Sequence, residues 1–194
     1  PYDVIANSAD TPKAIFVSGV NSAPLASDLN FTLADKKDAL QAGFTALTKL
    51  TSGKVHVTVA PNADFMPAVD GVSVHKGSGK HPVGLVSTQI AKIDPINKGE
   101  RVWVVQIEDV AIIGELFLTG KVNFERIVAL TGTGFEKPSY VKVIAGAQMS
   151  DVVANNLKDG NYRIFEPCSS KSYLTLSVFF NNRGRCMLFL TSNS

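Results

Sequence analysis

The chain has 194 residues, which suits one medium domain or a medium domain followed by a small one. Its formal net charge is only +2 and its lysines and arginines are scattered, so the composition argues against a nucleic-acid partner bound through a basic patch. Charged residues make up 19% of the chain, below the usual ~25%, and two interpretations stay open: a surface covered by another protein, or a well-packed α/β core.

The apolar segments and the two cysteines exclude further classes of protein. No stretch approaches the roughly 20 apolar residues of a membrane-spanning helix, and residues 1–4 lack the basic-then-apolar pattern of a signal peptide. The spacing of Cys168 and Cys186 matches no zinc, iron–sulfur or CxxC pattern. We therefore expect no transmembrane segment, and two thiols in a reducing compartment.

The first part of the chain predicts a strand, a helix and a second strand. Residues 14–18 are a continuous apolar run, as expected of a strand buried on both faces. Apolar residues from Leu40 to Leu50 recur at helical spacing, after a start predicted near Thr32. Residues 55–59 alternate between valine and polar side chains, which predicts the second strand.

The middle of the chain repeats this alternation. A short strand is expected at residues 72–75 and a helix over residues 81–93, because Pro82 would suit a first helical position. Residues 102–105 predict a strand. Residues 109–119 predict a helix that is apolar nearly all round, which is typical of a helix buried on most sides.

The last part predicts strands at residues 126–131 and 139–145 and a short helix from Met149. Beyond residue 160 the character changes, and residues 172–180 and 186–191 are expected to form two more strands. Strands that alternate with helices normally build a parallel sheet with helices on its faces. We therefore expect an α/β domain of the nucleotide-binding type and the beginning of a second domain.

The residues that such a fold uses to hold a nucleotide are missing. The loop after the first strand, residues 20–26, contains no glycine. The segment GSGK at residues 77–80 has Val74 and His81 where a phosphate loop needs a glycine and a hydroxyl residue. The sequence therefore predicts a scaffold for docking or for an unusual ligand.

The three histidines show no spacing typical of a metal site, and we expect neither metal ligands nor catalytic residues. His81 stands out, because the N–H groups of a helix beginning beside it would meet an anion or a carbonyl oxygen. A capping and packing role is the alternative. Lys80, His81 and Gly84 form the expected ligand edge. Sequence spacing does not exclude a Ser-His-Asp set, although the chain has no G-x-S-x-G motif.

Seven short segments carry a further signal in their order and spacing. They are TPKAIFV at 11–17, APLA at 23–26, KHPVGL at 80–85, GELFLTG at 114–120, RIVALTG at 126–132, KP at 137–138 and GA at 146–147. Together they resemble the A subunit of the bacterial sodium-translocating NADH:quinone oxidoreductase. The resemblance covers about residues 1–165.

The resemblance implies a Rossmann-like α/β fold over residues 1–138, with a mostly parallel sheet and helices on both faces. A partial β-grasp-like, ligand-binding segment is expected over residues 139–194. GNYRI at residues 160–164 fits the start of the β-grasp part of the family, but the chain diverges after about residue 165. We expect a truncated or frame-shifted end there. In the family, a lipoyl-like barrel domain precedes the Rossmann-like part.

The resemblance also implies a role. The family is similar to the NADH-binding flavoprotein subunit of respiratory complex I and to the C subunit of the Rnf complex, without their flavin, NADH and iron–sulfur sites. A non-redox subunit is therefore expected, peripheral at the cytoplasmic face of the bacterial inner membrane. It would support electron transfer from NADH to ubiquinone or menaquinone, coupled to Na⁺ export.

No cofactor is expected on this chain, except that quinone can approach it. The NADH, flavin and iron–sulfur sites are expected on other subunits, one of them membrane-embedded. The helix at 109–119 would be buried framework and the loop at 80–85 an exposed ligand edge. The alternative hypothesis is a stand-alone small-molecule-binding or enzymatic α/β domain that uses the crevice near Lys80 and His81.

Overall fold

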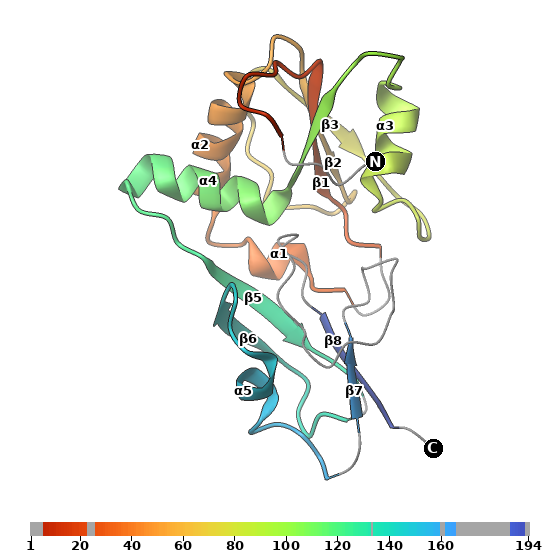
Figure 1. The fold of residues 1–194 in the computed structure, drawn as a ribbon, viewed down its shortest axis with the longest axis vertical. Helices are drawn as coiled ribbons and strands as arrows, with labels where there is room; N and C mark the ends of the chain where they lie inside the picture. Colours follow the sequence, from red (N-terminus) through yellow and green to blue (C-terminus); the bar gives the residue numbers. More distant parts are fainter. Residues whose placement is uncertain (1–5, 23–25, 133, 160–161, 166–186, 193–194) are drawn as a thin grey trace. The chain divides into compact units, whose positions relative to one another are not determined.

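A computed structural model describes residues 6–22, 26–132, 134–159, 162–165 and 187–192 (Figure 1). The chain divides into two compact units, which we describe separately. The first comprises Pro1–Ser22 and Asp28–Asn123, and the second Ala23–Ser27 and Phe124–Ser194. The division along the chain falls between Asn123 and Phe124.

The first unit is built on a four-stranded parallel sheet. Its strands are β1 (Ala14–Gly19), β2 (Val55–Val59), β3 (Val72–Lys76) and β4 (Val102–Gln106), in the order β3-β2-β1-β4. The chain moves outward from β1 to β3 and then returns to the other side of β1. The strand order therefore reverses between β1 and β4, where Rossmann-type sheets bind ligands.

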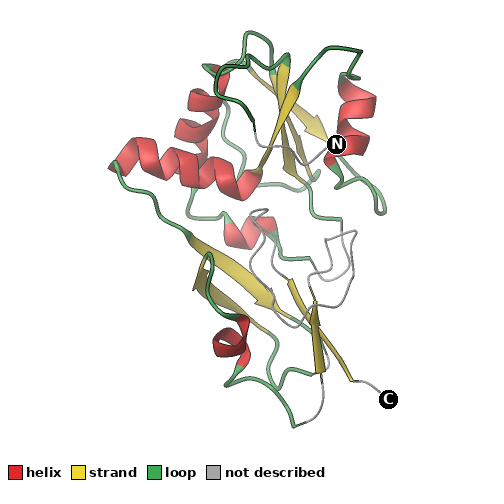
Figure 2. Ribbon diagram, viewed as in Figure 1, coloured by secondary structure: helices red, strands yellow, loops and turns green. Residues whose placement is uncertain are grey.

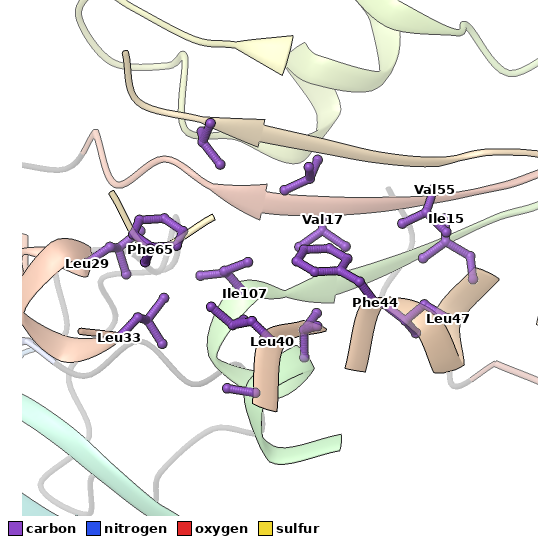
Figure 3. Close-up of a cluster of buried hydrophobic side chains, with 14 residues drawn as sticks. Ile15, Val17, Leu29, Leu33, Leu40, Phe44, Leu47, Val55, Phe65 and Ile107 are labelled. Carbon is purple, nitrogen blue, oxygen red and sulfur yellow. The ribbon is translucent and has the colours of Figure 1, made fainter. Parts of the chain in front are cut away.

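Helices cover both faces of this sheet, as predicted (Figures 1 and 2). The helices α1 (Leu29–Thr32), α2 (Lys37–Thr48) and α4 (Ile107–Thr119) contribute side chains to the core on one face, and α3 (Val86–Ile93) packs on the other. In the larger core, Phe44 of α2 lies beside Val17 of β1 (Figure 3). Each fully buried side chain of this size contributes about 1.5–3 kcal/mol to folding.

Two glycines allow α2 and α4 to pack closely. A Cβ at Gly114 would lie 2.5 Å from the carbonyl carbon of Ala39 and closer still to its oxygen. A Cβ at Gly43 would lie 2.9 Å from Val110 Cγ1. The backbones of the two helices therefore touch.

The predicted starts of three helices differ from those in the structure. Residues 81–84 form a turn with a cis His81-Pro82 peptide bond, and α3 begins only at Val86, so Pro82 does not occupy a first helical position. Thr32 belongs to the short helix α1, which Asp28 caps, and α2 begins at Lys37. The helix α4 begins at Ile107, so Asp109 lies in its first turn and does not cap it.

The prediction that the helix at 109–119 is buried on most sides was wrong for its second half. Only Ile107, Val110, Ala111 and Gly114 of α4 are buried. Phe117 is 67% exposed, because the close contact at Gly114 directs one stripe of α4 toward α2 and leaves the last turn beyond it. Composition alone does not reveal which apolar stripe has a neighbour.

The second unit contains β5 (Glu125–Leu130), β6 (Ser139–Ile144), β7 (Tyr162–Phe165), β8 (Met187–Ser192) and the short helix α5 (Met149–Val153). The sheet order is β6-β5-β8-β7, with antiparallel β5/β6 and β7/β8 pairs and a parallel β5/β8 pair. A small core packs between β5, β6 and α5; it comprises Val128, Leu130, Phe135, Val143 and Val153.

The predicted strands at 126–131 and 139–145 are confirmed as β5 and β6. The strand expected at 186–191 corresponds to β8. The strand expected at 172–180, and Cys168 and Cys186, lie outside the described residues. Within the described part of the chain, no helix has the length and apolarity that crossing a membrane requires.

Candidate functional site

The candidate site lies at the carboxyl end of β1, beside the point where the strand order reverses. Strand β1 ends in Ser18 and Gly19, and residues 20–22 continue from it. In dinucleotide-binding domains the loop here donates backbone N–H groups to a pyrophosphate. In this chain, the turn at residues 80–85 packs against it instead.

The backbone N–H and carbonyl groups of Gly84 both form hydrogen bonds that hold the turn against the end of β1 and the residues after it. Its N–H donates to Ser22 Oγ at 2.9 Å, and its carbonyl oxygen accepts from Ser18 Oγ at 3.2 Å. A Cβ at this position would lie 2.6 Å from Ser22 Oγ and 2.8 Å from the Val20 carbonyl oxygen. The contact therefore requires glycine, and Gly84 is a buried positioning residue within the predicted ligand edge.

Gln89 of α3 joins this network from beneath the turn. Its side chain is 5% exposed, and Nε2 donates to Ser18 Oγ and to the Val83 carbonyl oxygen, both at 3.1 Å. The Val83 carbonyl accepts only, which fixes the orientation of the amide. Among the described residues, Gln89 Oε1 is a buried acceptor with no hydrogen-bond partner.

Gln89 was not predicted from the sequence, although the sequence contained a sign that its side chain is buried and needs a partner. It is a polar residue beside Ile90 in a short amphipathic helix, and both residues are buried. A polar side chain on the buried face of such a helix needs a partner.

His81 is the exposed end of the network. Its Nδ1 lies 3.2 Å from Ser22 Oγ, which already accepts a hydrogen bond from the Gly84 N–H. When Ser22 donates its hydroxyl hydrogen to Nδ1, a neutral His81 carries its own proton on Nε2. The arrangement presents an N–H donor to solvent, next to the exposed ammonium group of Lys80.

The other two histidines come together on the sheet. His56 Nδ1 lies 3.1 Å from His75 Nε2, with the ring centroids 5.3 Å apart. The sequence alone did not bring these two residues together, because it does not show that β2 and β3 are neighbouring strands. The described residues contain no cluster of three or more His, Cys, Asp or Glu side chains with metal-binding geometry.

A shallow apolar groove lies between α2 and the end of α4, lined by residues that include Ala42, Ala46, Leu50, Phe117 and Leu118. Leu50, Phe117 and Leu118 are more than half exposed. Side chains of this size and apolarity are usually buried, so the groove marks a surface suited to contact with another molecule.

The chain matches two family models and several known proteins. Residues 1–122 match the model of the NqrA second alpha/beta domain, and residues 127–166 match the model of the NQRA C-terminal domain. The chain is 37% identical over 164 residues to the A subunit of the Na(+)-translocating NADH-quinone reductase of Marinomonas sp., covering 84% of this chain and 37% of that protein.

The corresponding protein of Yersinia pestis bv. Antiqua is 38% identical over 185 residues, which is 95% of this chain and 40% of the relative. That match runs past residue 165, where the sequence pattern was expected to diverge. The chain thus spans about two fifths of the length of these relatives.

Two crystal structures of a NAD+-reducing NiFe hydrogenase share the fold. The air-oxidized and H2-reduced states superpose with TM-scores of 0.60 and 0.61, at 12% and 13% sequence identity. In both comparisons the match covers 93% of this chain and 41% of the hydrogenase chain.

Proposed function

The chain belongs to the NqrA family, the A subunits of Na(+)-translocating NADH-quinone reductases, and on that premise we propose that it is a non-redox, peripheral part of such a complex. In this proposal it supports electron transfer from NADH to quinone, coupled to Na⁺ export. NADH, flavins and an iron–sulfur centre are held by other subunits. The chain docks at the cytoplasmic face of the membrane through a membrane-embedded subunit.

The observation that carries the non-redox role is the network around Gly84. The backbone after β1, which would cradle a pyrophosphate in a dinucleotide-binding domain, meets the turn at residues 80–85. A nucleotide at this position would have to displace a turn held by Ser18, Ser22 and Gln89. Those hydrogen bonds support a fold that keeps the shape of a nucleotide-binding domain without its function.

The same network supports contact between His81 and a quinone. A quinone offers carbonyl oxygens, which accept hydrogen bonds. When His81 Nδ1 accepts from Ser22, its Nε2–H is a matching donor, and Lys80 beside it favours the partial negative charge of a carbonyl or of a reduced quinone. We assign Lys80 and His81 as the ligand edge and Gly84 as the residue that positions it.

The apolar groove supports the part of the proposal that concerns other subunits. A chain that worked alone would gain nothing from leaving Phe117 and Leu118 in water, whereas a protein covered by its partners in a complex buries them. Burial of two such side chains at an interface contributes about 1.5–3 kcal/mol each before the cost of association.

The test is photo-crosslinking of a quinone analogue to the assembled complex containing this chain, followed by peptide mapping. We expect an adduct on the peptide that includes residues 80–85. The His81→Gln variant should reduce its yield several-fold, and His75→Gln is the matched control because it removes a histidine on the same domain away from this turn. Adducts confined to other subunits, or equal yields from both variants, would refute quinone contact at His81.

A further inference from the structure

The pair formed by His56 and His75 lies outside the site described above. Both side chains project from the same face of the sheet, the face that α3 covers in part, because alternate residues of a strand share a face. In the β2/β3 register, His56 pairs with Ser73 and Thr58 pairs with His75. The two histidines are therefore diagonal neighbours, and His56 Nδ1 lies 3.1 Å from His75 Nε2.

Phe16 holds one ring of the pair in place. The rings of Phe16 and His56 stack with centroids 5.1 Å apart and an angle of 28° between their planes. The His75 ring is tilted by 40° relative to that of His56, and β3 is the edge strand of the sheet. The His56 ring is thus packed against Phe16, while the His75 ring projects from an edge strand.

The surroundings of His56 favour the neutral imidazole, which is the form that binds metals. Burial lowers the pKa of His56, and the charges of His75 and Lys54 lower it further. The charge of Asp94 raises it, although Asp94 itself forms an ion pair with Lys13 at 2.7 Å. One ring nitrogen must donate and the other accept in the 3.1 Å contact, so a single N–H hydrogen lies between the rings.

We propose that His56 and His75 form a two-imidazole binding site for a divalent metal ion. The class of ion is the one that prefers imidazole nitrogen, which includes Zn²⁺, Cu²⁺ and Ni²⁺. The cation takes the place of the hydrogen bond between the rings. The ring that donated this bond carries its proton on its other nitrogen instead, by exchange with water, so both rings stay neutral and each turns a lone pair toward the metal. Imidazole nitrogen suits these ions, whereas Mg²⁺ and Ca²⁺ prefer oxygen.

The spacing of the two nitrogens fits this chemistry. With metal–nitrogen bonds of about 2.0–2.1 Å, two nitrogens 3.1 Å apart subtend an angle of about 100° at the metal. That angle lies between the right angle of a tetragonal site and the wider angle of a tetrahedral one, so the two nitrogens can keep their separation while each ring turns its lone pair away from the line that joins them. The remaining positions are open to water or to a group from another molecule.

The chain offers a matched control, because it contains three histidines and only two belong to the pair. The experiment is a calorimetric titration of the full chain with ZnCl₂ in a Cys168→Ser, Cys186→Ser background, since thiolates would otherwise compete for zinc. We expect saturation near one equivalent and weaker binding at low pH, where protons compete with the metal.

His56→Gln and His75→Gln should each weaken zinc binding by about tenfold or more, because losing an outer-shell partner of a metal ligand already costs about 10–100-fold. His81→Gln should bind as tightly as the parent. Circular dichroism checks that each variant folds. The unmutated pair gives a second readout in ¹⁵N NMR, where zinc should shift the imidazole nitrogens of His56 and His75 and leave those of His81.

Three results would overturn the proposal. They are no binding by the parent, binding that survives both single substitutions, and zinc-induced shifts confined to His81. Any of them would leave the pair as a hydrogen bond within the fold.

Discussion

The close contact between α2 and α4 makes Gly114→Ala the most informative single substitution. A methyl group there would lie 2.5 Å from the Ala39 carbonyl carbon and 2.9 Å from the Gly43 nitrogen, both backbone atoms. The Ala39 carbonyl oxygen would lie closer still, and ordinary contact begins at 3.4 Å, so the helices would have to separate by more than roughly 1 Å.

The expected cost follows from two opposing terms. Overpacking of a core contact costs about 1–3 kcal/mol, and the upper end applies because backbone atoms cannot rotate away. Alanine restores about 1 kcal/mol, since it favours a helix more than glycine does. We therefore expect Gly114→Ala to lower the free energy of unfolding by about 2 kcal/mol.

The assay is urea unfolding followed by the fluorescence of Trp103, the single tryptophan, which lies in β4 against the same core. Gly120→Ala is the control, because Gly120 ends the same helix in open space with φ at 71°. Its strain alone should cost about 1 kcal/mol. If Gly114→Ala is as stable as the parent, or less destabilised than Gly120→Ala, the helices are not in backbone contact.

Three further predictions concern the histidines and the ligand site. Gly84→Ala should displace the turn at residues 80–85, because its methyl would lie 2.6 Å from Ser22 Oγ; ¹⁵N NMR should then show shifted imidazole nitrogens of His81, and an unchanged spectrum would contradict the network. Calorimetry of the chain with NADH and with flavin should show no micromolar binding, and a clear isotherm for either would refute the non-redox role. Burial lowers the pKa of His56 below its usual value near 6.5, so its contribution to stability is present above that pH and is lost as the pH falls through the lowered pKa. Chemical denaturation at about pH 7.5 and about pH 5 should therefore show a smaller pH effect in His56→Gln than in the parent, and equal effects would exclude His56 as the titrating group.

Local pattern was enough to locate most elements of this chain. The valines of β2 and the apolar run of β1 predicted strands, because period and composition depend only on neighbours along the chain. The absence of glycine from residues 20–26 was equally visible, since the loop follows directly from β1. Those features, with the order and spacing of the short segments that carry the resemblance, were sufficient for the α/β class and the family.

Contacts between distant segments were decided only in the folded chain. Ser22 meets His81 and Gly84 across about sixty residues of sequence, and His56 meets His75 only because β2 and β3 are adjacent. Strand β5 looks locally like any other apolar strand, yet it pairs with β6 outside the first sheet. Periodicity tells which face of an element is apolar, but the neighbour of that face is chosen by the packing of the whole molecule.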